Sequence, residues 1–276
     1  MNTYNTMKTF YQFLEALSSH GGFTMPHGDD FKPTLNKKDT EYISGMYKRP
    51  LVISSRGKLR GGIIAVLDTV LARVKDFNFH IYTGDYVRTD MNIQKYFFDK
   101  NNIPKEDIVF LKSKSQGDLL TPWMILHNMA HAVFEMGNGS SKNAIHRIIY
   151  KLVKSLTFGE TPFVLDILRL KLDPKLSPLK TNEILSLLFN FASVKSNVQS
   201  EDELVYEIFV SYLYGGGKLK RPVGDKLNKL TIFCNQKSSV KHTENYVSEL
   251  VDDAFTKIEE EIKTSLDYCR GKVIED

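Results

Sequence analysis

The stretch "GGIIAVLDTVLARVKDFNFHIYTG", residues 61–84, determines the fold that we expect. Its first part carries apolar residues at helical spacing and ends in charged residues, which predicts a helix over 61–76. The segment that follows is aromatic and β-branched, and it predicts a strand over 77–84. A helix leading directly into a strand is typical of a sheet with parallel neighbours.

The same alternation continues on both sides of this stretch. "PLVISS" at 50–55 and "DIVFLKS" at 107–113 predict two further strands, and 91–101 predicts a helix between strands. Beyond Asp118 the character becomes helical. We expect further helices at 9–17, 122–136, 141–156, 161–171, 181–194, 200–214 and 243–268, and an edge strand in "KLTIFCN", residues 229–235.

These elements indicate one domain over residues 1–276. We expect an α+β fold that is mostly helical, with a small sheet contributed mainly by residues 1–117 and a helical part over 118–276. Composition agrees with an ordinary globular chain, since 42% of residues are hydrophobic, 25% are charged and the formal net charge is +4. Two distant cysteines, no secretory signal pattern and no long apolar run predict a soluble, cytoplasmic protein without membrane association.

The helix predicted at 122–136 carries an unusual polar stripe. On a helical wheel His127, Asn128, His131 and Glu135 fall on one side, and apolar residues cover the rest. The spacing of four residues places both imidazoles one turn apart, so that two nitrogens can converge on one ion. Two other interpretations stay open: the stripe faces solvent, or the histidines are hydrogen-bonded donors in the core.

A second apolar helix supplies a candidate third ligand. In "SEDELVYEIFVSYLYGGG", residues 200–217, Ser200 and Glu203 have the spacing of a capping box, whereas Glu207 lies midway along the helix. A carboxylate there is costly unless it is paired, bound to a cation or facing water. We therefore predict a zinc site formed by His127, His131 and Glu207, with a position left open for water.

The pattern of a His-x-x-x-His helix followed by a helix with a Glu ligand resembles the zincin metallopeptidases, over residues 118–217. The resemblance implies a metal-dependent hydrolase acting on an amide or ester of a peptide or small molecule, with zinc as cofactor. Asn128 occupies the position of the catalytic glutamate in that family, and an amide cannot act as the general base. Asn128 can still orient a water, and Glu135 is the nearest candidate base; alternatively the zinc is structural, or peptidase chemistry has been lost.

Two other classes of function stay open. The loop "SSRGKLRGG", residues 54–62, offers Arg56, Lys58 and Arg60 to a nucleic acid or another anion. The amphipathic helix at 243–268 is a candidate docking element for a partner or for a second copy of the chain.

Overall fold

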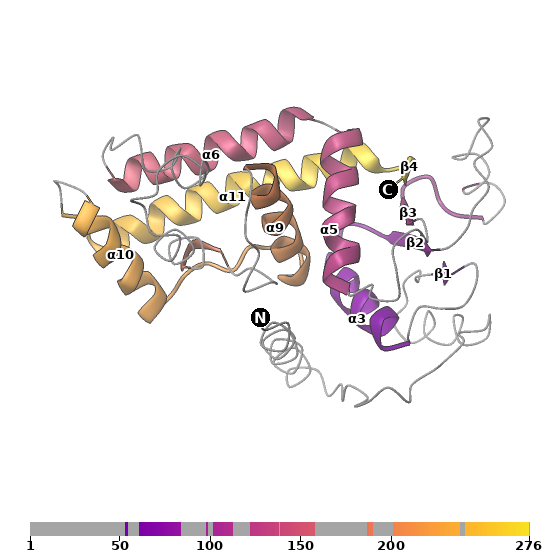
Figure 1. Ribbon diagram of the computed structural model, residues 1–276, viewed down its shortest axis with the longest axis horizontal. Coiled ribbons are helices and arrows are strands. Elements are labelled where there is room, and N and C mark those ends of the chain that lie inside the picture. Colours follow the sequence, from indigo (N-terminus) through magenta and orange to yellow (C-terminus); the bar gives the residue numbers. More distant parts are fainter. Residues whose placement is uncertain are drawn as a thin grey trace, which may run out of the picture. The chain divides into compact units, whose positions relative to one another are not determined.

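The computed structural model describes residues 53–54, 61–83, 98, 102–112, 122–137, 139–157, 187–189, 201–237 and 241–275. Figure 1 shows the elements in these ranges. They are β1 (Ile53–Ser54), α3 (Gly61–Ala72), β2 (Phe79–Thr83), β3 (Ile108–Lys112), α5 (Pro122–Ala132), the π-helical turn η1 (Val133–Gly137), α6 (Gly139–Thr157), α9 (Glu201–Tyr214), α10 (Asp225–Lys237), α11 (Glu244–Cys269) and β4 (Val273–Glu275).

The chain divides into two compact units. The first comprises Met1–Asn138, Leu213–Gly217 and Ser265–Asp276, and the second comprises Gly139–Tyr212 and Lys218–Thr264. The expected boundary between an α/β part and a helical part, at 117/118, therefore falls before α5, whereas α5 belongs to the first unit. The assignment of the whole chain to one domain stays a prediction.

The first unit contains a parallel four-stranded sheet in the order β1-β2-β3-β4. The mostly helical α+β class with a small, mainly N-terminal sheet is thus confirmed, as are the strands expected around β1, β2 and β3. In β3 the residues on both faces are inaccessible, from Ile108 to Leu111. Such a continuous apolar run is typical of a parallel strand with neighbours on both sides and cover on both faces.

The strand β4 was not predicted from the sequence. Its three residues lie at the C-terminal end of the chain, where Val273 pairs with Val109 of β3 and Glu275 pairs with Leu111. The backbone N–H of Gly271 donates to the carbonyl of Asp107 at 3.2 Å, which joins the beginnings of these two strands. In the same unit α5 packs against α3 and contacts β4 (Figure 1).

The edge strand expected at 229–235 is wrong, because this segment lies within the helix α10. Leu230 and Cys234 are both fully buried, and a spacing of four residues brings them to one face of a helix. Ile232, which a strand would place on the same side as these two residues, is 50% exposed. Burial of one helical face therefore overrides the β-branched composition.

The elements described in the second unit are helices, and the predicted helices at 141–156, 200–214 and 243–268 are confirmed as α6, α9 and α11. Within it α10 packs against α6 (Figure 1). The apolar face of α11 is buried, from Val247 to Ile262. A role for α11 in docking a partner or a second copy stays a prediction.

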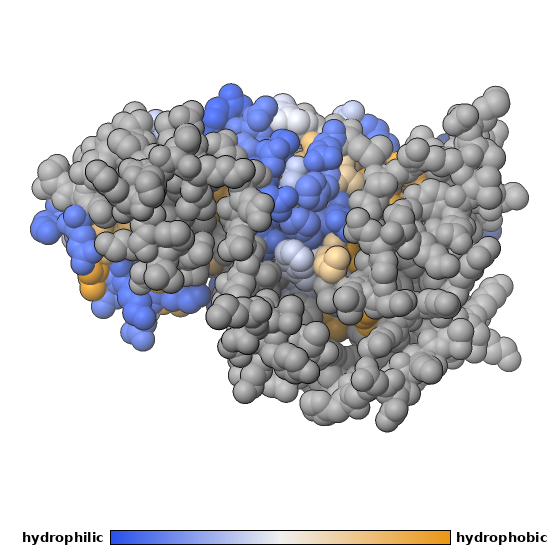
Figure 2. Space-filling view, in the orientation of Figure 1, coloured by the Kyte–Doolittle hydropathy of each residue, from blue (hydrophilic) through white to orange (hydrophobic). Residues whose placement is uncertain are grey.

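On the face shown in Figure 2 the described residues are mainly hydrophilic. None of the helices in the described ranges combines the length and apolarity that crossing a bilayer requires. The helices predicted at 9–17 and 161–171, and nearly all of those at 91–101 and 181–194, lie outside the described residues.

Candidate metal centre

The helix α5 buries most of its circumference and leaves one polar strip only partly covered. Pro122 occupies the first helical position, where a missing N–H costs nothing. Four apolar side chains of this region are inaccessible, those of Ile125, Leu126, Met129 and Val133. The side chains of His127, Asn128 and His131 are half-buried. The apolar majority thus fixes the rotation of α5, and that rotation brings the polar strip to the edge of the packed region.

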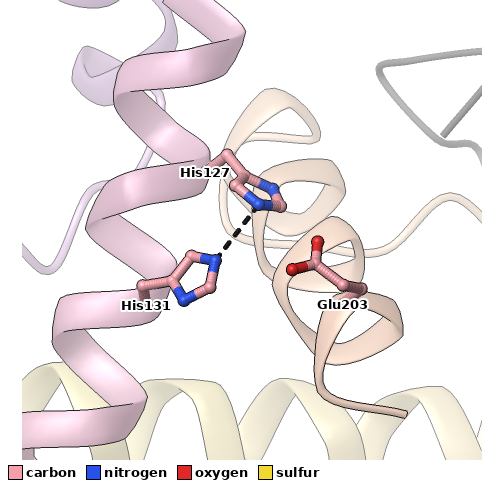
Figure 3. A group of neighbouring side chains, drawn as sticks. All are labelled: His127, His131 and Glu203. Atoms are coloured by element: carbon pink, nitrogen blue, oxygen red, sulfur yellow. Dashed lines mark hydrogen bonds between the residues drawn. The ribbon is translucent and has the colours of Figure 1, made fainter. Parts of the chain in front are cut away.

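The two imidazoles on this strip face each other through like atoms. Nε2 of His131 lies 3.3 Å from Nε2 of His127, and the ring centroids are 5.0 Å apart in an edge-to-face arrangement (Figure 3). When both rings are neutral, the N–H of one of these nitrogens donates a hydrogen bond to the other nitrogen. The same two nitrogens are the atoms with which histidines most often bind a metal.

The separation of these nitrogens matches the spacing that a tetrahedral ion requires. Zinc–nitrogen bonds are about 2.0–2.1 Å long, so two of them at a tetrahedral angle hold their nitrogens about 3.3 Å apart. The observed distance between the two Nε2 atoms is 3.3 Å. This separation is therefore compatible with both nitrogens binding one tetrahedral ion.

Two neighbours fix the orientation of the imidazole rings. Oε1 of Glu135, in the turn η1, lies 3.1 Å from Nδ1 of His131, the ring nitrogen remote from His127. The ring of Trp123 packs on His127 with centroids 4.9 Å apart. A carboxylate on the outer nitrogen of a metal-ligating histidine is a recurrent arrangement, since it orients the ring and raises its basicity.

The helix α9 in the second unit carries the carboxylates considered in the sequence. Glu207 is only 1% exposed, whereas Glu203, one turn earlier, is half-buried. The first turn of α9 is attached to α6 by Asp202, whose Oδ2 accepts from Nζ of Lys142 at 2.8 Å. The other oxygen of Asp202 lies 3.7 Å from Nε2 of His146, so this half-buried histidine pairs with an acid.

The C-terminal end of α9 belongs to the same unit as α5. Nη1 of Arg73, which follows α3, donates to the carbonyl of Tyr214 at 3.2 Å. Gly216, at φ 72°, closes the helix by donating its N–H to the carbonyl of Leu213 at 2.9 Å. A side chain at Gly216 would meet Cβ of Arg73 at 3.0 Å, so glycine also permits this close approach.

A second histidine–carboxylate pair lies in the sheet. Nε2 of His80 in β2 is 2.8 Å from Oδ2 of Asp107, which immediately precedes β3, and both side chains are buried. Burial lowers the pKa of His80, and the hydrogen bond to Asp107 offsets only part of that effect. The ring is therefore neutral at pH 7, and it donates its Nε2 hydrogen to the carboxylate.

The structure brings together three of the predicted site residues, His127, His131 and Glu135. Asn128 lies beside them on α5, and Glu207 lies on α9. Trp123 was not among the predicted site residues, although its spacing of four residues from His127 was a signal for contact. The predicted anion-binding residues Arg56, Lys58 and Arg60 lie outside the described residues.

Comparisons with protein-family models, with curated proteins and with solved structures gave no match. The function proposed below therefore rests on the geometry of the side chains.

Proposed function

We propose that the chain binds a divalent transition metal, zinc above all, through His127, His131 and a carboxylate of α9. The observation that carries the proposal is the 3.3 Å separation of the two Nε2 atoms. Imidazole ligands favour zinc and its neighbours in the first transition row, whereas calcium and magnesium prefer sites made of oxygen atoms. A site of two histidines and one carboxylate leaves the fourth position of a tetrahedral ion open for water.

Glu203 is our first candidate for the third ligand. Its carboxylate is the one of α9 that we assign to a metal-binding group with the two histidines, and Figure 3 draws these three side chains. Glu207, the third ligand predicted from the sequence, lies on the same strip of α9, one turn further along. The side chain of Glu203 is half-buried, and that of Glu207 is almost inaccessible. Substitution of each glutamate in turn separates the two assignments.

Metal-assisted hydrolysis of an amide or ester is the activity that such a centre supports, in the manner of the zincin-like proteins. Asn128 cannot accept the proton of the attacking water. Glu135 is the predicted base, yet its Oε1 lies on the far nitrogen of His131, 3.1 Å away. We therefore place metal binding first and hydrolysis second in the proposal.

The proposal is tested by metal titration of tag-free protein that has been stripped with a chelator. We expect one zinc or cobalt ion per chain, and loss of binding in His127→Ala and His131→Ala. A matched control is His242→Asn, which alters a histidine of the second unit that stacks on Tyr246. Unchanged stoichiometry in His131→Ala would refute the site.

The third ligand is tested in the same titration. Glu203→Gln is expected to weaken zinc binding strongly, whereas Glu207→Gln is expected to leave it within a few-fold. The exposed Glu244, in the first turn of α11, serves as the control position through Glu244→Gln. The opposite ranking of the two variants would return the third ligand to Glu207.

A further inference from the structure

The two hydrogen bonds of His131 determine where its proton lies. A neutral imidazole has one N–H and one acceptor nitrogen, and a carboxylate can only accept. Because Oε1 of Glu135 lies 3.1 Å from Nδ1, this nitrogen carries the hydrogen of His131. Nε2 of His131 is then an acceptor, so the hydrogen shared across the 3.3 Å contact belongs to Nε2 of His127.

We infer that Glu135 holds His131 in its metal-binding form, and that His127 alone must change tautomer when a metal binds. The inference rests on the proposed metal site. His131 already presents a lone pair on Nε2, whereas Nε2 of His127 must lose its hydrogen before it can ligate. Since a neutral ring keeps one hydrogen, the hydrogen of His127 moves from Nε2 to Nδ1 of the same ring. The exchange therefore releases no net proton.

The turn η1 is the local feature that places Glu135 next to Nδ1 of His131. In a π-helical turn each residue advances less around the axis than in an α-helix, so Glu135 stays nearer to the direction of His131. The side chain of Glu135 is 56% exposed, which makes this contact a weak contributor to stability. Its effect is on the orientation and tautomer of the ring, so Glu135 is a positioning residue.

The proton assignment is tested by long-range ¹H–¹⁵N spectra of histidine-labelled, metal-free protein at pH 8, with resonances assigned from His127→Ala and His131→Ala. We expect His131 to carry its hydrogen on Nδ1 and His127 on Nε2. Addition of one equivalent of zinc should move the hydrogen of His127 to Nδ1 and leave the tautomer of His131 unchanged. A metal-free protein in which His131 is protonated on Nε2 overturns the inference.

The role of Glu135 is tested by zinc affinity together with the same spectra. Glu135→Ala should reduce zinc affinity by about 10- to 100-fold and release His131 from the Nδ1–H form. Glu135→Gln keeps an acceptor oxygen without the charge and should give an intermediate affinity. Glu244→Ala, an exposed acid in α11, is the control.

The outcomes separate the inference from the proposed function. If the unaltered protein binds no zinc, the metal site is refuted, and the metal-free spectra still decide the proton positions. If it binds zinc and Glu135→Ala changes neither affinity nor tautomer, the metal site stands and the role of Glu135 is refuted.

Discussion

Replacement of Asp107 by alanine should destabilise the first unit, because this one side chain joins the beginnings of two strands. Its carboxylate accepts from Nε2 of His80 at 2.8 Å and from Nδ2 of Asn78 at 3.0 Å. Asp107 is 2% exposed and His80 is 7% exposed, so alanine would leave a buried ring N–H without an acceptor. A hydrogen bond to a charged group contributes about 1.5–3 kcal/mol when buried. Asn78 is exposed, so its hydrogen bond to Asp107 contributes less to the free energy of unfolding.

Together these contributions predict a loss of about 2–4 kcal/mol in the free energy of unfolding of Asp107→Ala. Chemical denaturation followed by circular dichroism measures this loss. If the two units unfold in separate transitions, the transition that shifts in Asp107→Ala is assigned to the first unit. The neighbouring Glu106 is exposed, and Glu106→Ala is the matched control, expected to stay within about 0.5 kcal/mol of the unaltered protein. A loss below about 1 kcal/mol in Asp107→Ala would refute the reasoning, because the pair would then add nothing to the sheet beyond an ordinary surface contact.

The remaining predictions concern pH, thiol reactivity and one arginine. Because burial lowers the pKa of folded His80 below its usual 6.5, the unfolded chain takes up the proton first. Its contribution to stability should therefore be complete above about pH 7 and decrease as the pH falls through 6.5, and His80→Gln should flatten that decrease in denaturation curves. Burial raises the pKa of Cys234 to about 12 and that of Cys269 to about 11, so a thiol reagent at pH 8 should label neither until denaturant is added; labelling of the folded chain would contradict this. Arg221 donates to Asp252 at 2.8 Å and pairs with Glu259, so Arg221→Met should cost about 1–3 kcal/mol in thermal or chemical unfolding, whereas a loss near zero would show that solvent screens this network.

The elements that the sequence predicted well are those whose signal is local. The helix and strand of 61–84 and the long helix near the C-terminus carry their periodicity within one segment, and the structure confirms them. The pairing of β4 with β3 joins Val273 to Val109, and nothing in three residues indicates a partner so distant in the chain. The error at 229–235 has the same origin, because Leu230 and Cys234 are buried by neighbours that the segment itself does not specify. In the candidate site, the facing of His127 and His131 follows from spacing alone.

The contact between Glu135 and His131 is a feature of the site that a sequence pattern cannot specify in full. A helical wheel places the carboxylate of Glu135 on the same side of the helix as the two histidines. From that position Glu135 was predicted to be a general base. The structure adds that its oxygen lies on the nitrogen of His131 that points away from His127, which no periodicity can distinguish. A carboxylate in that position makes Nε2 a better ligand, whereas a base must reach a water on the ion itself. Since Asn128 cannot act as the base either, the polar strip of α5 contains groups suited to holding a metal and none already positioned to take a proton from its water. That asymmetry is the physical reason for ranking metal binding above hydrolysis.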